Sequence, residues 1–160
     1  MKCWQLNNLN MPYKDLHSKP FDETTITKLE IFEDYAEAWI PTFVMQPAIN
    51  EIHLFYFFSG PGYDINGVAG SPIRLLNKIN AQLGNFLQTK TKIVLHFNEF
   101  EPLKKNNQEK FELLRKNCEE YLSNHPQFKY FVDIQLYNKD VQSLFFELIP
   151  KINKYPSLVY

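Results

Sequence analysis

Three short runs rich in apolar residues are separated along this chain by longer segments whose apolar residues recur at helical spacing. The runs lie at 52–58, 92–96 and 131–136, and the first reads Ile-His-Leu-Phe-Tyr-Phe-Phe. Such runs are typical of strands buried on both faces of a parallel sheet. Strands that alternate with helices need crossover connections, which place helices on the sheet. We therefore predict an α/β fold, a three-layer sandwich with a mostly parallel sheet flanked by helices.

The segments between the runs carry helix start signals. Ser71 is a candidate N-cap with Pro72 at the first helical position, and one apolar stripe follows as far as residue 87. The other predicted elements are a loop over 59–70, a helix over 108–123 and a last helix over 141–152 that follows a cap at Asn138 or Asp140.

The first part of the chain has weaker signals. Residues 1–25 are polar, contain two prolines and are expected to be irregular. Residues 26–32 place Leu29 and Ile31 in period two, which predicts a half-covered strand. A short helix or turn is expected over 34–41.

The balance of charge excludes several kinds of partner. Seventeen basic and eighteen acidic residues give a net charge of −1, which is too even for a nucleic-acid groove. Cys3 and Cys118 are isolated, as expected for a reducing compartment. The sequence has no N-terminal apolar signal and no run of eighteen apolar residues. We expect residues 1–160 to form a single cytosolic domain without nucleic-acid partners or an integral membrane segment.

Glycine is absent from the first 59 residues, and all five glycines lie between Gly60 and Gly84. A phosphate-binding loop needs glycines after the first strand, because backbone N–H groups must approach the phosphates closely. No G-x-x-x-x-G-K-[ST] run occurs, so we predict that the chain holds no nucleotide cofactor. No histidine or cysteine pair has the spacing of a zinc site either, so we expect no metal.

Several motifs in the second half of the chain have counterparts in a known family. They are His96-Phe97-Asn98-Glu99 after a buried strand, Tyr137-Asn138 after the last predicted strand, and Leu148-Ile149-Pro150 followed by a polar stretch and Leu158. In these motifs and in element order, residues 21–160 resemble the Ras-like small GTPases, and most of all the Rag/Gtr GTPases. The resemblance implies the P-loop NTPase-like architecture of a Ras-like G domain.

The nucleotide-contact positions of that family are altered here. Phe97 stands at its lysine, Glu99 stands at its aspartate, and the segment with Glu33 and Ala36 lacks the glycine of its switch. The resemblance therefore implies a non-catalytic pseudo-GTPase that interacts with proteins, in a Rag/Gtr-type signalling or scaffold complex. It also implies a cytoplasmic subunit held at the lysosome or vacuole by its partners. Residues 2–6 are predicted to supply the central strand of the sheet.

Two other functional classes fit parts of the sequence. Ser59-Gly60-Pro61-Gly62 after a hydrophobic strand is similar to the Ser-Gly-His-Gly of caspase-like peptidases, but Pro61 replaces the histidine of their Cys-His dyad. Cys118 lies on the apolar stripe of a helix, where we expect a buried small hydrophobe. The alternatives are a caspase-like hydrolase domain, intact or degenerate, and a flavodoxin-like binding module.

Aromatic residues in or near loops are candidate anchors for a protein partner. The predicted set is Tyr35, Trp39, Phe43 and Tyr63. His53 and His96 flank strands, and we expect both to be core-edge residues with satisfied hydrogen bonds. Residues 30–37 contain an acidic cluster, which consists of Glu30, Glu33, Asp34 and Glu37. We predict that it is a solvated strand end rather than a Mg²⁺ site.

Overall fold

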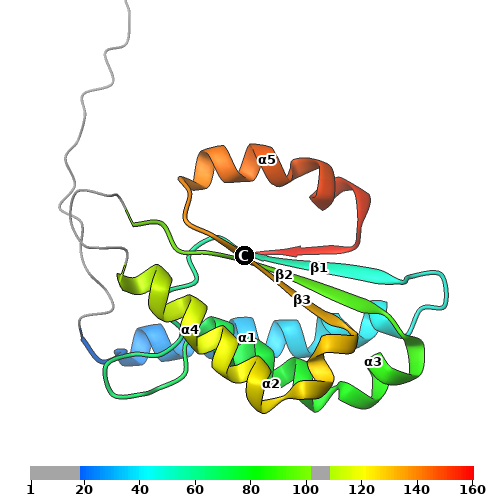
Figure 1. The fold of residues 1–160 in the computed structure, drawn as a ribbon, viewed down its shortest axis with the longest axis horizontal. Coiled ribbons are helices and arrows are strands. Elements are labelled where there is room, and N and C mark those ends of the chain that lie inside the picture. The colour runs from blue at the N-terminus through cyan, green and yellow to red at the C-terminus, as the bar shows by residue number, and fades with distance from the viewer. Residues whose placement is uncertain (1–18, 102–108) are drawn as a thin grey trace, which may run out of the picture.

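The computed structural model describes residues 19–101 and 109–160, and its centre is one parallel sheet (Figure 1). The strands are β1 (Glu51–Tyr56), β2 (Lys92–Asn98), β3 (Val132–Tyr137) and β4 (Ser157–Val159). They lie in the order β3-β2-β1-β4, and His53 of β1 is opposite Val94 on one side and Ser157 on the other. Helices cover both faces, so the predicted three-layer α/β class is confirmed.

The helices are divided unequally between the two faces. Figure 1 shows most of the helices below the sheet and the last helix above it. Those below are α1 (Glu23–Val44), α2 (Ser71–Ala81), α3 (Leu83–Thr89) and α4 (Glu109–Asn124), with the short 3-10 helix η1 (Pro126–Tyr130) after α4. The helix above is α5 (Val141–Lys154), which carries the chain from β3 back across the sheet to β4 beside β1. Strand order reverses at that step, which places the switch point of the fold between β1 and β4.

The segment before β1 is one helix, and the predicted strand over 26–32 is wrong. Asp22 caps α1 by accepting a hydrogen bond from the Thr25 N–H at 2.7 Å, so helical structure begins inside the predicted irregular segment 1–25. Ile31 is 64% exposed while Leu29 is buried, which a strand face shared by the two would not allow. The buried residues instead follow helical spacing: Leu29, Phe32, Ala36, Ile40 and Val44.

A proline inside α1 is accommodated by a side chain from the next helix pair. Pro41 has no N–H, so the carbonyl of Glu37 four residues earlier has no partner within the helix. The Gln82 side-chain amide donates to that carbonyl at 3.1 Å. Gln82 sits between α2 and α3, where the single helix predicted over 71–87 is divided. The break and the proline are therefore parts of one arrangement.

Helix caps and one strand also differ in detail from expectation. Gly70, and not Ser71, is the N-cap of α2, and the Ser71 hydroxyl donates instead to the Tyr56 hydroxyl at 2.7 Å. Asp140 caps α5 through the Ser143 N–H, as one of the two predicted caps. The strand β4 was not predicted.

The two faces of the sheet support cores of different size. The main core lies between the sheet and α1, α2 and α4, and the strands contribute Ile52, Leu54, Ile93 and Leu95 to it. Phe55 and Phe57 point the other way and pack with Leu144 and Leu148 of α5 in a small core. The α5 layer is thus held by far less apolar contact than the opposite layer.

Residues 2–6, the predicted central strand, lie outside the described residues. Within 19–101 and 109–160, β1 and β2 occupy the centre of the sheet and each is paired on both sides. None of the helices in these ranges is both long enough and apolar enough to cross a membrane.

Candidate functional site

The carboxyl ends of the strands carry the polar groups of the candidate site. Parallel strands bring these ends to one edge of the sheet, which is where α/β proteins hold their ligands. Residues 57–62 follow β1, Glu99 and Phe100 follow β2, and residues 138–140 lead from β3 into α5. The chain therefore assembles three loops at one edge from distant parts of the sequence.

The loop after β1 is tied to the end of β2. The Ser59 N–H donates to the Asn98 carbonyl at 2.9 Å, and the Gly60 N–H donates to Glu99 Oε2 at 2.8 Å. Gly60 and Gly62 have φ values of 68° and 100°, a region that L side chains rarely adopt. The Gly60 N–H therefore donates to the Glu99 carboxylate, and it is not available to a bound anion.

Asn98 joins the ends of three strands. Its side-chain amide donates to the carbonyls of Phe57 at 3.2 Å and Lys139 at 3.0 Å, and its Oδ1 accepts from the Lys139 N–H at 3.1 Å. Asn98 is 1% exposed, so these bonds satisfy a buried amide. Both amide hydrogens of Asn98 are used within the protein, which gives the residue a structural role.

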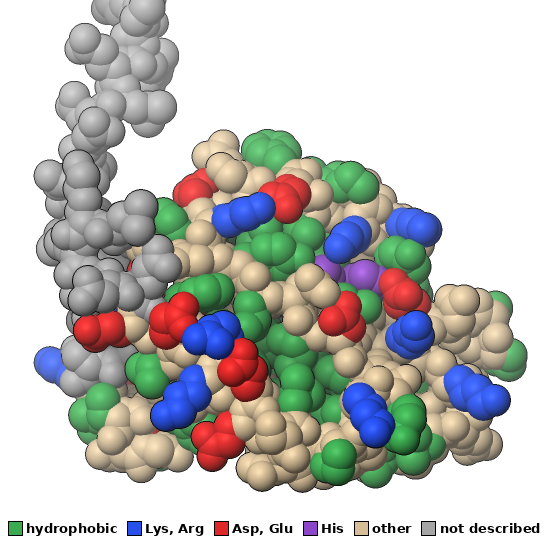
Figure 2. Space-filling model, viewed as in Figure 1, with side chains coloured by type: hydrophobic (Ala, Val, Ile, Leu, Met, Phe, Trp, Pro, Cys, Tyr) green, Lys and Arg blue, Asp and Glu red, His purple; other side chains and the backbone are tan. Residues whose placement is uncertain are grey.

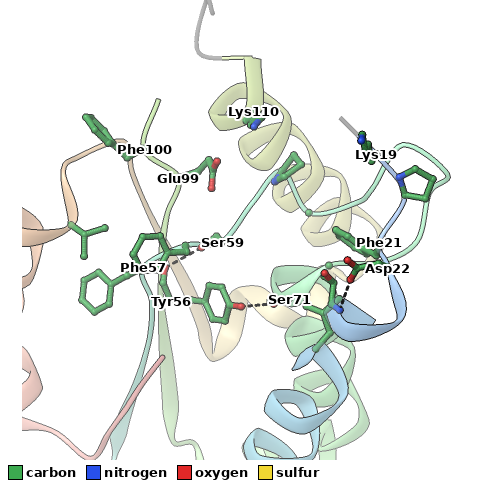
Figure 3. Close-up of a pocket in the computed structure, with 18 of the residues that line it drawn as sticks. Lys19, Phe21, Asp22, Tyr56, Phe57, Ser59, Ser71, Glu99, Phe100 and Lys110 are labelled. Carbon is green, nitrogen blue, oxygen red and sulfur yellow. Dashed lines mark hydrogen bonds between the residues drawn. The ribbon is translucent and has the colours of Figure 1, made fainter. Parts of the chain in front are cut away.

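A cavity of about 830 Å³ lies beyond the ends of β1 and β2 (Figure 3). Its floor includes the hydrogen-bonded pair Tyr56 and Ser71, and burial raises the pKa of Tyr56 to about 12 despite that bond. Much of its wall is apolar or aromatic, and five charged residues also line it. The wall includes Phe21, Leu29, Phe57, Pro61 and Val141, and the charged residues are Lys19, Asp22, Glu99, Lys110 and Asp140.

Two exposed aromatic residues stand at the rim of this cavity. Phe58 is 74% exposed and Phe100 is 41% exposed, although both line the cavity. Figure 3 shows Phe100 beside Glu99, on the side of the cavity opposite Phe21 and Asp22. Neither residue was among the predicted site residues. The available signal was a phenylalanine two residues after the end of each of two buried strands.

The residues predicted from the GTPase resemblance do not form one site. His96 and Phe97 point to opposite faces of the sheet, and Phe97 is fully buried in the main core. Glu33 lies on α1, where its carboxylate accepts from Arg74 at 2.8 Å, and Ala36 is buried against the main core. Only Glu99 reaches the cavity.

The acidic cluster lies on α1 and not at a strand end, so that part of its prediction is wrong. Glu33 and Glu37 face α2, where Lys78 bonds to Glu37 and lies 3.6 Å from Glu33. These pairs join α1 to α2 along their exposed side. Among the described residues, no group of three or more His, Cys, Asp or Glu is placed to hold a metal ion.

The predicted interface residues fall into two places. Tyr35, Trp39 and Phe43 lie on α1, where Tyr35 is 58% exposed and the Trp39 and Phe43 rings are 4.6 Å apart. Trp39 and Phe43 are partly buried and pack against the main core, which gives them a structural role. Tyr63 is separate, in the loop before α2, where it pairs with Ala69.

No cysteine-based catalytic pair forms at the described strand ends. Pro61 carries no titratable group, and the Ser59 hydroxyl donates to the Tyr56 carbonyl at 3.0 Å rather than to a base. Cys118 lies on α4 in the main core, 2% exposed, as predicted. Burial raises the pKa of its thiol to about 12, so almost no thiolate is present at neutral pH.

The Cys118 thiol is expected to react at least about 100-fold more slowly with a thiol reagent in the folded protein than after unfolding in urea. Peptide mapping by mass spectrometry separates its labelling from that of Cys3. Rapid native labelling of Cys118 would contradict its burial and support a reactive cysteine.

The chain matches no protein-family model, no curated protein and no solved structure. The class that the molecule itself defines is a doubly wound α/β fold with a cavity at the carboxyl ends of β1 and β2.

Proposed function

We propose that the protein is a non-catalytic binding domain whose carboxyl-edge cavity takes a bulky apolar side chain of a protein partner. The observation that carries the proposal is the cavity itself, because it lies where α/β sheets bind ligands and is walled mainly by apolar side chains. Three of its polar side chains bond within the protein: Glu99 accepts from Gly60, Ser71 donates to Tyr56, and Asp140 caps α5. Lys19 and Lys110 also line it.

The same groups support the non-catalytic part of the proposal. A general base needs a titratable atom near a nucleophile, and Pro61 offers none beside Ser59. A phosphate ligand needs free backbone N–H groups, and the Gly60 N–H already donates to a carboxylate.

A protein partner fits the rim better than a small polar ligand does. Phe58 and Phe100 are exposed aromatic side chains, and aromatic residues around an apolar pocket are the usual anchors of protein interfaces. The net charge of −1 gives no long-range attraction for nucleic acid. Recognition would rest on shape and apolar contact.

Membership of a Rag/Gtr-type signalling complex is the narrower form of this proposal. Its support is the element order of the second half and the Leu148-Ile149-Pro150 motif, which lies inside α5 rather than at its end. The helical state of α1 gives it no support, because the resemblance expected a switch strand there. A place at the lysosome or vacuole through such partners is a prediction of the same resemblance.

Phe58→Ala and Phe100→Ala are each expected to weaken partner binding by about 30-fold, the loss typical of an interface anchor. Partners captured from cells by the wild-type protein would be identified, purified and titrated against each variant. Both side chains are exposed, so the free energy of unfolding should change by less than about 0.5 kcal/mol.

Tyr130→Ala is the matched control, because Tyr130 is 67% exposed but lies in η1 before the amino end of β3. A photo-crosslinking amino acid at position 58 should label the partner, and one at position 130 should not. Equal loss of binding in all three alanine variants would refute the site. Saturable micromolar binding of a guanine nucleotide with Mg²⁺ would refute the non-catalytic class.

A further inference from the structure

The sheet face below α5 is polar, although both faces of a parallel sheet are usually apolar. Glu51 and His53 of β1, Lys92 and His96 of β2, and Asp133 of β3 lie on this face by their register. Both histidines are 2% exposed. Figure 2 shows histidine between lysine and acidic side chains on this side of the molecule. Buried polar groups of this kind must be satisfied within the protein.

Glu51, His53 and His96 form one continuous hydrogen-bonded chain with Tyr137 across β1, β2 and β3. His53 Nε2 lies 2.8 Å from Glu51 Oε1, His53 Nδ1 lies 2.9 Å from His96 Nε2, and His96 Nδ1 lies 3.0 Å from the Tyr137 hydroxyl. The prediction that both histidines are satisfied core-edge residues is thus confirmed. Every ring nitrogen of the pair has a partner.

The carboxylate at one end fixes the direction of every bond. An ionised Glu51 only accepts, so His53 Nε2 carries the proton of a neutral ring and its Nδ1 accepts. His96 Nε2 must then donate to His53, and His96 Nδ1 must accept from the Tyr137 hydroxyl. Burial raises the pKa of Tyr137, which keeps that hydroxyl protonated.

The same geometry limits the pair to one added proton. With one more proton, His53 donates from both nitrogens, His96 becomes an Nδ1–H ring, and Tyr137 accepts; no heavy atom has to move. With two more protons, N–H would face N–H between nitrogens 2.9 Å apart. In an unfolded or opened chain the two rings are separate, so each of them can take up a proton.

Charged groups of both signs surround the pair. Glu51 and Asp133 favour a charged His53, and Lys151 of α5 disfavours charge on both rings. Lys92, Lys151 and Tyr155 line a hollow of about 400 Å³ that reaches His53, and Glu147 acts on Tyr137 from α5. Burial lowers the pKa of His53 and lowers that of His96 to about 3.

The pair is also a mechanical link to the last elements of the chain. The His53 ring stacks on Tyr155, which connects α5 to β4, with centroids 4.4 Å apart. The His96 ring stacks on Phe55, a member of the small core under α5, at 4.3 Å. The small core is the main apolar contact of α5 with the sheet, whereas β4 has three register pairs to β1 and places Leu158 at the edge of the main core.

We propose that the Glu51–His53–His96–Tyr137 chain is an acid-sensitive latch, which holds α5 and β4 on the sheet while the pair is neutral and releases them when protons accumulate. Opening exposes both rings, so the opened form binds more protons than the closed form below pH 6.5. Acid therefore favours opening of the α5 layer before the main core is lost. This inference is independent of the partner-binding proposal.

Two measurements on the wild-type protein test the latch. Nitrogen NMR at pH 7.5 should find both His53 and His96 as Nε2–H tautomers, whereas His125, which bonds the Tyr121 carbonyl through Nδ1, should be Nδ1–H. Hydrogen exchange, corrected for its intrinsic pH dependence, should show protection of α5 and β4 falling about tenfold per pH unit below 6.5. Protection of β2 should fall less.

Variants locate the effect. His96→Gln should remove most of the pH dependence of α5 and β4 exchange, and His125→Gln, the matched control, should leave it unchanged. Nδ1–H tautomers at His53 or His96, independent titration of both rings near pH 6.5, or unchanged protection of α5 and β4 between pH 7 and pH 5 would overturn the latch. The first two results come from the wild-type chain, so the test does not depend on a variant that folds.

Discussion

Acidification from pH 7 to pH 4 is expected to lower the free energy of unfolding by about 3 kcal/mol through His96 alone. The pKa of His96 is lowered from 6.5 to about 3, first by burial and then by the charges of His53 and Lys151. Above pH 6.5 the His96 ring is mostly neutral in both the folded and the unfolded chain, so it has little effect on the free energy of unfolding. Below it the unfolded chain takes up a proton that the folded chain refuses, so stability falls until the pH reaches the folded pKa.

Urea unfolding at a series of pH values checks this expectation, with wild-type, His96→Gln and His125→Gln proteins compared. Carboxylates titrate over the same range in all three, so the difference between variants isolates the ring. The His96→Gln curve should lose about 3 kcal/mol less between pH 7 and pH 4 than the other two. Parallel curves for all three proteins would mean that His96 is protonated in the folded state.

Ile40→Ala should cost about 2–5 kcal/mol in the free energy of unfolding, whereas Ile31→Ala on the same helix should cost less than about 0.5 kcal/mol. Ile40 is fully buried against the main core, and Ile31 is 64% exposed. The substitution is the same in both cases, so differences in helix propensity cancel. The difference between the two losses of stability therefore shows which face of α1 is buried.

Denaturant unfolding of the two variants provides that contrast. The strand predicted over 26–32 would instead give Ile31 a buried face and a cost similar to that of other half-buried isoleucines. Comparable losses for Ile31→Ala and Ile40→Ala would show that the helical burial pattern of α1 is incorrect.

The first three strands and most helices could be predicted, because their apolar residues recur regularly. β1, β2 and β3 coincide with the three apolar runs to within about two residues, and the stripes of α2, α4 and α5 have the expected period. The error at α1 came from a short window: Leu29 and Ile31 alternate over a few residues, while the buried set extends to Val44. Pro41 predicts a helix end, so the sequence gives no sign that the helix extends to Val44. The helix continues past Pro41 because the Gln82 side-chain amide donates to the Glu37 carbonyl that the proline leaves unpaired.

The site was less predictable, because its parts meet only in three dimensions. The loop at 59–62 and Glu99 could be selected from the sequence, but their bond joins residues 39 positions apart. Phe58 and Phe100 could not be distinguished from core phenylalanines, since nothing local decides whether a residue after a strand faces solvent. β4 has three residues and owes its state to pairing with β1 rather than to its own pattern.

The pairing of β4 with β1 has a consequence for biosynthesis. Of the four strands, the last to leave the ribosome is hydrogen-bonded to the first. While the intervening residues are made, one side of β1 has no neighbour from this sheet, and the apolar sequence Ile-His-Leu-Phe-Tyr is a template for association with other chains. The nascent chain is therefore at greatest risk of aggregation between the synthesis of β1 and that of β4, and yield in cells should depend on chaperones that act in this interval.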